Sequence, residues 1–108
     1  MNQYFDRLEC KWLPMPSKVY KANLPIALEV PALRDHVLIV HKTIGAAPKD
    51  KAWTVTHQDT SFGIASGRTR AEAMENARAV LLRHGNARFL SAIEGAKKQI
   101  AVLMANHI

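Results

Sequence analysis

The chain has 108 residues, 48% hydrophobic and 22% charged, which is typical of one globular domain and excludes a disordered or low-complexity protein. No apolar run is long enough to span a membrane and no signal peptide is visible, so we expect a cytoplasmic protein. The net charge of +6, from 15 Lys and Arg against 9 Asp and Glu, favours an anionic partner such as nucleic acid.

Residues 1–35 are interrupted by prolines, which remove backbone donors and favour extended conformations in the residues before them. We expect this proline-punctuated N-terminal segment to be irregular and to wrap the core. Within it, the spacing of aromatic and apolar residues predicts a short helix over Met1 to Trp12. The residues from Ile26 to Val30 predict a short strand.

Residues 36–66 carry the signals of a three-stranded antiparallel β-meander. The predicted strands, each rich in β-branched or alternating apolar residues, cover 36–44, 52–58 and 62–66. Trp53 and Phe62 fall on the apolar face of their strands, so we expect core positions for them rather than a base-stacking pair.

Both faces of the first predicted strand are apolar. Leu38, Val40 and Ile44 form one row, which we expect to point away from the core. Because monomers rarely expose a large contiguous apolar patch, this row is a candidate interface for a protein partner or for a homodimer.

The period of the hydrophobic pattern changes after Gly67. Thr69 and Glu72 have the spacing of a capping box, which predicts a helix start, and Gly85 predicts the end of that helix. A second helix is predicted to run to Ala105, with Ile93 among its core residues. The predicted fold class is therefore α+β: a three-stranded antiparallel meander followed by two C-terminal helices (69–105), all within a single domain.

Catalytic and metal-binding patterns are weak. The only clustered candidates for nucleophilic chemistry are Ser61, Ser66, His57 and Asp59, and no nucleophile elbow or phosphate loop accompanies them. The histidines lack the spacing of a zinc site, although His41 and His57 could meet across adjacent strands. The lone cysteine has no partner. We therefore expect a non-enzyme without cofactor or metal.

The strongest candidate site lies at the predicted helix start. Arg68 and Arg70 place two guanidinium groups beside free backbone donors at a helix N-terminus, an arrangement that suits phosphate. Lys49 and Lys51, in the loop after the first predicted strand, would add to it if that loop folds to the same side. The alternative is an ordinary solvated surface on which these arginines pair with neighbouring carboxylates.

Residues 37–82 resemble two known modules at this junction. A strand that ends in Gly-x-Thr and a helix that opens with Glu72-Ala73 and Asn76-Ala77 resemble the HicB-type antitoxins. That resemblance implies oligomerisation and neutralisation of a small ribonuclease toxin. The strand and helix order is also similar to the second half of a double-stranded RNA-binding domain, where Arg68 and Arg70 would face RNA phosphate.

Two functions follow as hypotheses. The first is a small non-catalytic module that binds nucleic-acid phosphates through its basic residues. The alternative is a protein-interaction or inhibitor module, antitoxin-like or encoded by a mobile element, that acts by occluding the surface of a protein partner.

Overall fold

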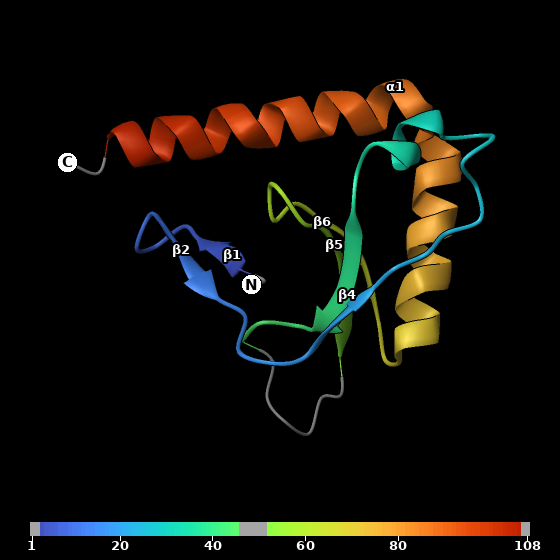
Figure 1. Ribbon diagram of the computed structural model, residues 1–108, viewed down its shortest axis with the longest axis horizontal. Coiled ribbons are helices and arrows are strands. Elements are labelled where there is room, and N and C mark those ends of the chain that lie inside the picture. Colours follow the sequence, from blue (N-terminus) through green and yellow to red (C-terminus); the bar gives the residue numbers. More distant parts are fainter. Residues whose placement is uncertain (1–2, 46–51, 107–108) are drawn as a thin grey trace.

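Six strands in two antiparallel sheets, one 3-10 turn and one long helix make up the described part of the computed structural model, residues 3–45 and 52–106 (Figure 1). The smaller sheet pairs β1 (Gln3–Asp6) with β2 (Lys11–Pro14). The larger sheet has the order β3-β4-β5-β6. Its strands are β3 (Val19–Lys21), β4 (Leu38–Lys42), β5 (Trp53–His57) and β6 (Gly63–Gly67).

A hairpin replaces the helix that we expected near the N-terminus, so that prediction is wrong. The Asp6 carboxylate accepts hydrogen bonds from the backbone N–H groups of Leu8, at 2.8 Å, and Glu9, at 3.2 Å. Such bonds favour a turn over a continuing helix. Phe5 and Trp12 then meet across the two strands, with ring centroids 5.5 Å apart, and Phe5 is buried. The aromatic residues whose spacing suggested a helix lie instead on two paired strands.

The predicted three-stranded meander is also wrong in strand number. β4, β5 and β6 occupy the three predicted segments, but β3 pairs with β4 and makes the sheet four-stranded. The segment from Ile26 to Val30 is a turn rather than a strand, closed by a 2.9 Å bond from the Val30 N–H to the Ile26 carbonyl. It leads into the 3-10 helix η1 (Pro31–Arg34).

The C-terminal region forms one helix, α1 (Arg70–Ala105), rather than the two separate helices we predicted. Thr69 is its N-cap, as predicted: the Thr69 hydroxyl accepts a 3.1 Å hydrogen bond from the Glu72 N–H. Within α1, Gly85 has φ 79° and ψ 174°, a conformation open almost only to glycine, and it kinks the helix. The two halves of α1 consequently point in different directions (Figure 1).

The core lies between the sheet and α1. Val40 and Val55 from the sheet are fully buried with the small residues Ala73 and Ala77 of the first half of α1, which let the helix approach closely. Gly67 marks the tightest approach, because a Cβ there would stand 2.5 Å from the backbone nitrogen of Ala73. The second half of α1 adds Phe89 and Ile93, and the N-terminal segment adds Ala22, Ile26 and Val30 to the same cluster.

Strand β4 is buried on both faces, which corrects our expectation of an exposed apolar row. Leu38 and Val40 face α1 and belong to the core, while Ile39 and His41 on the opposite face are buried as well. Of the three candidate interface residues, only Ile44 is exposed, at 37%. In Figure 1 the hairpin lies on one side of the sheet and the first half of α1 on the other. No helix in the described ranges is long and apolar enough to cross a membrane.

Candidate functional site

Arg70, the first residue of α1, packs its guanidinium against two aromatic rings. Its Cζ lies 4.0 Å from the centroid of the Tyr20 ring and 5.6 Å from that of Trp53. The two ring centroids are 6.2 Å apart. These separations are within the range of cation–π attraction, which is worth roughly 0.5–1 kcal/mol at exposed sites. The rings therefore hold the guanidinium of an exposed residue in place, and its N–H groups have no hydrogen-bond partner among the described residues.

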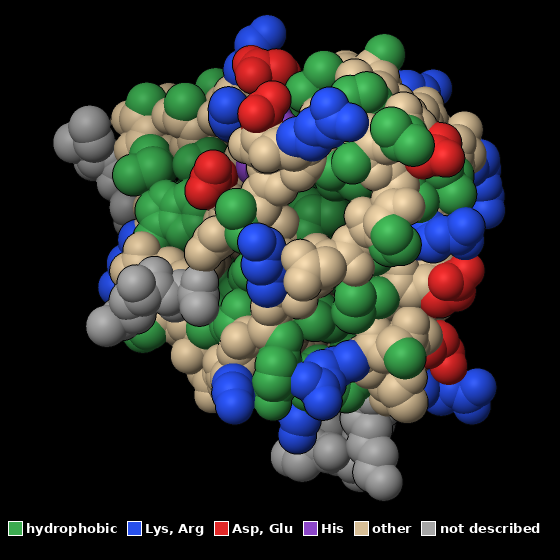
Figure 2. Space-filling view, turned by 45° about the vertical axis from the view of Figure 1, so that its right-hand side comes forward, with side chains coloured by type: hydrophobic (Ala, Val, Ile, Leu, Met, Phe, Trp, Pro, Cys, Tyr) green, Lys and Arg blue, Asp and Glu red, His purple; other side chains and the backbone are tan. Residues whose placement is uncertain are grey.

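Other cations surround the same aromatic pair. The Nζ of Lys18 lies 5.1 Å from the Tyr20 centroid. A hollow of about 420 Å³ is lined by Lys42, Trp53, Arg68, Thr69 and Arg70. We call the following residues the cationic cluster: Lys18, Tyr20, Lys42, Trp53, Arg68 and Arg70. In Figure 2, Lys and Arg side chains gather around hydrophobic ones at the lower edge of the molecule, the end at which α1 begins in Figure 1.

Sheet register brings the members of the cationic cluster together. Lys42 at the end of β4 is the partner of Trp53 at the start of β5, and Trp53 is in turn the partner of Gly67 at the end of β6. The chain turns from Gly67 into the Thr69 cap, which sets Arg68 and Arg70 beside Trp53. Strand β3 adds Tyr20 from the other edge of the sheet. The site thus joins residues from three strands of this sheet, β3, β4 and β5, with residues at the helix start.

Carboxylates compensate little of this positive charge. Arg68 pairs with Glu72 at 3.8 Å, but its side chain is 87% exposed, so solvent screens the pair. Within the described ranges, no carboxylate lies at ion-pair distance from Arg70, Lys42 or Lys18. Among the described residues, the expected alternative, in which the arginines pair with neighbouring carboxylates, therefore applies to Arg68 and not to Arg70.

The backbone donors at the start of α1 are partly occupied by the helix's own side chains. The Glu72 N–H bonds the Thr69 hydroxyl, and the Arg68 N–H donates to the Glu72 carboxylate at 3.4 Å. The capping box is thus shifted by one residue, because the carboxylate bonds Arg68 rather than the cap residue. The positive charge of this site therefore comes mainly from the side-chain cations rather than from free backbone N–H groups.

A second polar group lies under the second half of α1. The His36 Nδ1 and the His57 Nε2 are 2.9 Å apart, and the His57 Nδ1 is 2.8 Å from the Thr60 hydroxyl. Phe89 packs edge-on against both imidazoles. Burial lowers the pKa of His57 from 6.5 to about 4; His36 and Lys97 also lower it, whereas Asp59 opposes them. His57 is therefore neutral at pH 7 and bridges two polar side chains inside the core.

The candidates for nucleophilic or metal chemistry do not assemble. Both ring nitrogens of His57 are engaged, and its hydroxyl partner is Thr60 rather than Ser61 or Ser66. His41 bonds Thr56, the residue before His57, and faces the other side of the sheet because side chains alternate along a strand. Among the residues that the structure describes, no group of three potential metal ligands is found.

Comparisons with known proteins do not identify a family for this chain. No family model, curated protein or solved structure matches the chain.

Sequence reasoning found part of this site. The structure brings Arg68 and Arg70 together at the helix start, whereas Lys49 and Lys51 lie outside the described residues. Lys18 and Tyr20 were missed because their place in the cluster depends on β3, which was not predicted. Lys42 was missed although its strand was predicted, and Trp53 was expected in the core. The signal that could have found Tyr20 is its position between Lys18 and Lys21, since interleaved basic and aromatic residues are typical of nucleic-acid surfaces.

Proposed function

We propose that this protein is a non-catalytic module that binds nucleic acid through the phosphates, at the cationic cluster. The observation that carries the proposal is Arg70, which is stacked on Tyr20 and Trp53 without a carboxylate partner in the described structure. A guanidinium fixed by aromatic rings keeps a planar set of N–H donors ready for a phosphate. Lys42 and Lys18 stand beside it as additional point charges.

The chemistry of the cluster matches that of surfaces that bind single-stranded nucleic acid. Such surfaces combine a positive groove that follows the backbone with aromatic side chains and arginines that stack against bases. The distribution of charge is consistent with this. From Arg68 onward the chain has 7 basic and 3 acidic residues, against 8 and 6 before it.

The experiment that tests this proposal is a fluorescence anisotropy titration of a labelled single-stranded oligonucleotide of about 12 nucleotides, at several salt concentrations. If phosphates are the ligands, the logarithm of the affinity falls linearly with the logarithm of salt, by roughly 0.7 per neutralised phosphate of a single strand. We expect Arg70→Gln to reduce that slope by about one phosphate equivalent and the affinity by about tenfold.

A matched control is available on the same helix. Arg83 is exposed, lies outside the cationic cluster, and is 13 residues beyond Arg70, or about 20 Å along helical geometry. Arg83→Gln removes the same charge and should leave the salt slope unchanged. Equal losses in both variants would mean that net charge alone drives binding, and absence of binding at about 50 mM salt would remove the proposal.

A protein-interaction module is the second candidate. Val102 and Met104, near the C-terminal end of α1, are 56% and 47% exposed. An apolar helix end of this kind fits a protein partner or a second copy of the chain. Light scattering across a concentration series tests the homodimer: a mass that stays at that of one chain, 12.0 kDa, would exclude it.

A further inference from the structure

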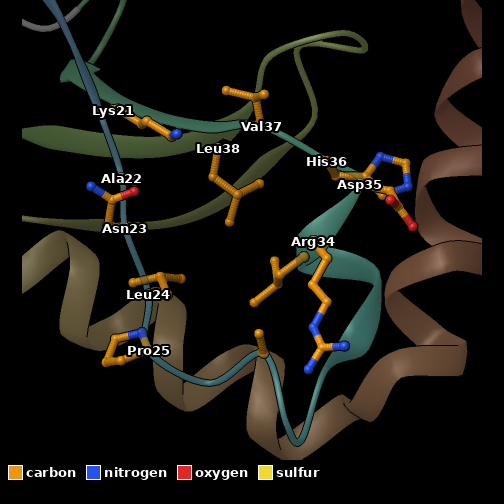
Figure 3. A pocket seen from close by; sticks show the side chains of 12 residues that line it. Lys21, Ala22, Asn23, Leu24, Pro25, Arg34, Asp35, His36, Val37 and Leu38 are labelled. Atoms are coloured by element: carbon orange, nitrogen blue, oxygen red, sulfur yellow. The ribbon is translucent and has the colours of Figure 1, made fainter.

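A second concave site lies beside β3. A cavity of about 510 Å³ lies between two segments of the chain. One segment is Lys21 to Ala27, at the end of β3 and beyond it, and the other is Leu33 to Leu38. Figure 3 shows Leu38 directed into the cavity, Leu24 on the facing segment, and Lys21 extending over one end. Arg34 lies along the opposite wall. The cavity therefore has apolar walls and a cation from each of its two bounding segments.

The polar lining of this cavity favours an anionic ligand with an apolar, flat body. Neither Lys21 nor Arg34 has a carboxylate at ion-pair distance among the described residues. Asp35 is the one carboxylate in the lining, and Figure 3 shows it pointing away from the cavity, with His36, toward α1. Ligand sites are commonly cavities of roughly 300–1,000 Å³ with mostly apolar walls and a few placed polar groups.

Strand β3 connects the cationic cluster to the cavity, because Tyr20 belongs to the cluster and Lys21 lines the cavity. Tyr20, against which the Arg70 guanidinium stacks, directly precedes Lys21 in β3, and their side chains point to opposite faces of the sheet. Because β3 is the edge strand, a ligand can pass over this edge from one side chain to the other. Figure 2 shows basic side chains at the lower edge of this face and also below and above a hollow with hydrophobic side chains at its floor, with acidic side chains beside the upper basic ones. A chain of phosphates leaving Arg70 along β3 would reach Lys21 and then Arg34.

We propose that this cavity receives one unstacked base of a single-stranded nucleic acid whose backbone runs from the cationic cluster past Lys21 to Arg34. The inference depends on the proposed function and narrows its ligand to single strands. A base in a duplex would have to leave its stack and its pair, which costs a few kcal/mol, whereas a single strand offers its bases directly. Half-buried Leu24 supplies an apolar contact to the base over a floor that includes the buried Leu38, and the two cations hold its flanking phosphates.

The test compares two oligomers of equal length and charge, a single-stranded DNA and the same sugar-phosphate chain without bases. We expect wild-type protein to bind the base-bearing strand roughly five- to hundredfold more tightly, about the gain that one stacked base produces. This comparison requires no variant. Equal affinities would overturn the proposal, and so would tighter binding to a hairpin duplex than to the single strand.

A cavity-filling variant separates this site from the aromatic pair. Ala27 lines the cavity and Ala79 lies on the exposed side of α1, so Ala27→Leu and Ala79→Leu make the same change at the site and away from it. We expect Ala27→Leu to lose most of the preference for the base-bearing strand and to bind the abasic chain normally. Ala79→Leu should match wild type with both.

Each outcome has a distinct meaning. If folded Ala27→Leu, checked by circular dichroism, keeps the full preference for bases, the cavity is not the base site and only the cationic cluster stands. If neither oligomer binds wild type at about 50 mM salt, the proposed function fails, and this inference fails with it.

Discussion

Acidification should destabilise this protein through His57, whose side chain is fully buried. Its pKa is 6.5 in a solvated chain and about 4 in the fold, mainly because burial disfavours the charged imidazolium. As the pH falls below 6.5, His57 becomes protonated in the unfolded chain but stays neutral in the folded chain. The stabilising contribution is therefore complete above pH 6.5, is lost progressively between 6.5 and about 4, and does not change further below that.

The magnitude follows from the difference of about 2.5 between the two pKa values. At 1.36 kcal/mol for each pKa unit, the loss is on the order of 3 kcal/mol, a large part of the 5–15 kcal/mol that stabilises a typical domain. The two partners of His57, His36 and Thr60, are bonded at 2.9 and 2.8 Å. His57→Gln keeps an amide in place of the imidazole and removes the titration, so it is the matched variant.

The assay is urea unfolding followed by circular dichroism at intervals from neutral pH to about pH 4. We expect the free energy of unfolding to fall more steeply with acid in wild type than in His57→Gln, while the titration of carboxylates contributes equally to both. Parallel curves for the two proteins would refute the reasoning. So would an NMR titration in which the His57 imidazole of the folded protein ionises near 6.5.

Two further predictions concern α1. Gly85→Ala should lower the free energy of unfolding by roughly 1–3 kcal/mol in chemical denaturation, because alanine is strained at φ 79° and ψ 174°; an unchanged midpoint would mean that the kink does not need glycine. Thr69→Ala should cost roughly 0.5–2 kcal/mol through the lost cap, and Ile93→Ala, 1% exposed in the core, roughly 2–5 kcal/mol through a cavity. The reverse order of these two costs would show that the second half of α1 does not pack on the sheet through Ile93.

The sequence predicted those elements that depend on the pattern of neighbouring residues. The strands β4, β5 and β6 and the Thr69 cap are where alternation and capping residues placed them, and Gly85 interrupts the helix where a stop was expected. The stop became a kink because Gly85 leaves the helical conformation, with a positive φ, for one residue only, and Phe89 and Ile93 return to the same core.

The features that the sequence did not predict depend on contacts between segments that lie far apart in the chain. The segment from Tyr4 to Trp12 fits both helical and alternating spacing, and the Asp6 turn decides between them. Leu38 and Val40 form one of the two apolar faces of β4. The sequence pattern could not show that other segments cover both faces of this strand. Tyr20 joins Arg70 only because the short strand β3 pairs with β4, a contact between distant segments.

The central claim is that phosphates of nucleic acid bind at the cationic cluster. Its most direct measurement is a map of amide chemical shifts in labelled protein during titration with a single-stranded oligonucleotide, with the side-chain Nε–H signal of Arg70 included. We predict shifts at residues 18–21, at Lys42 and Trp53, and at residues 68–71, together with a shift of the Arg70 signal. Shifts confined to the C-terminal half of α1, or no shifts at about 50 mM salt, would contradict the claim.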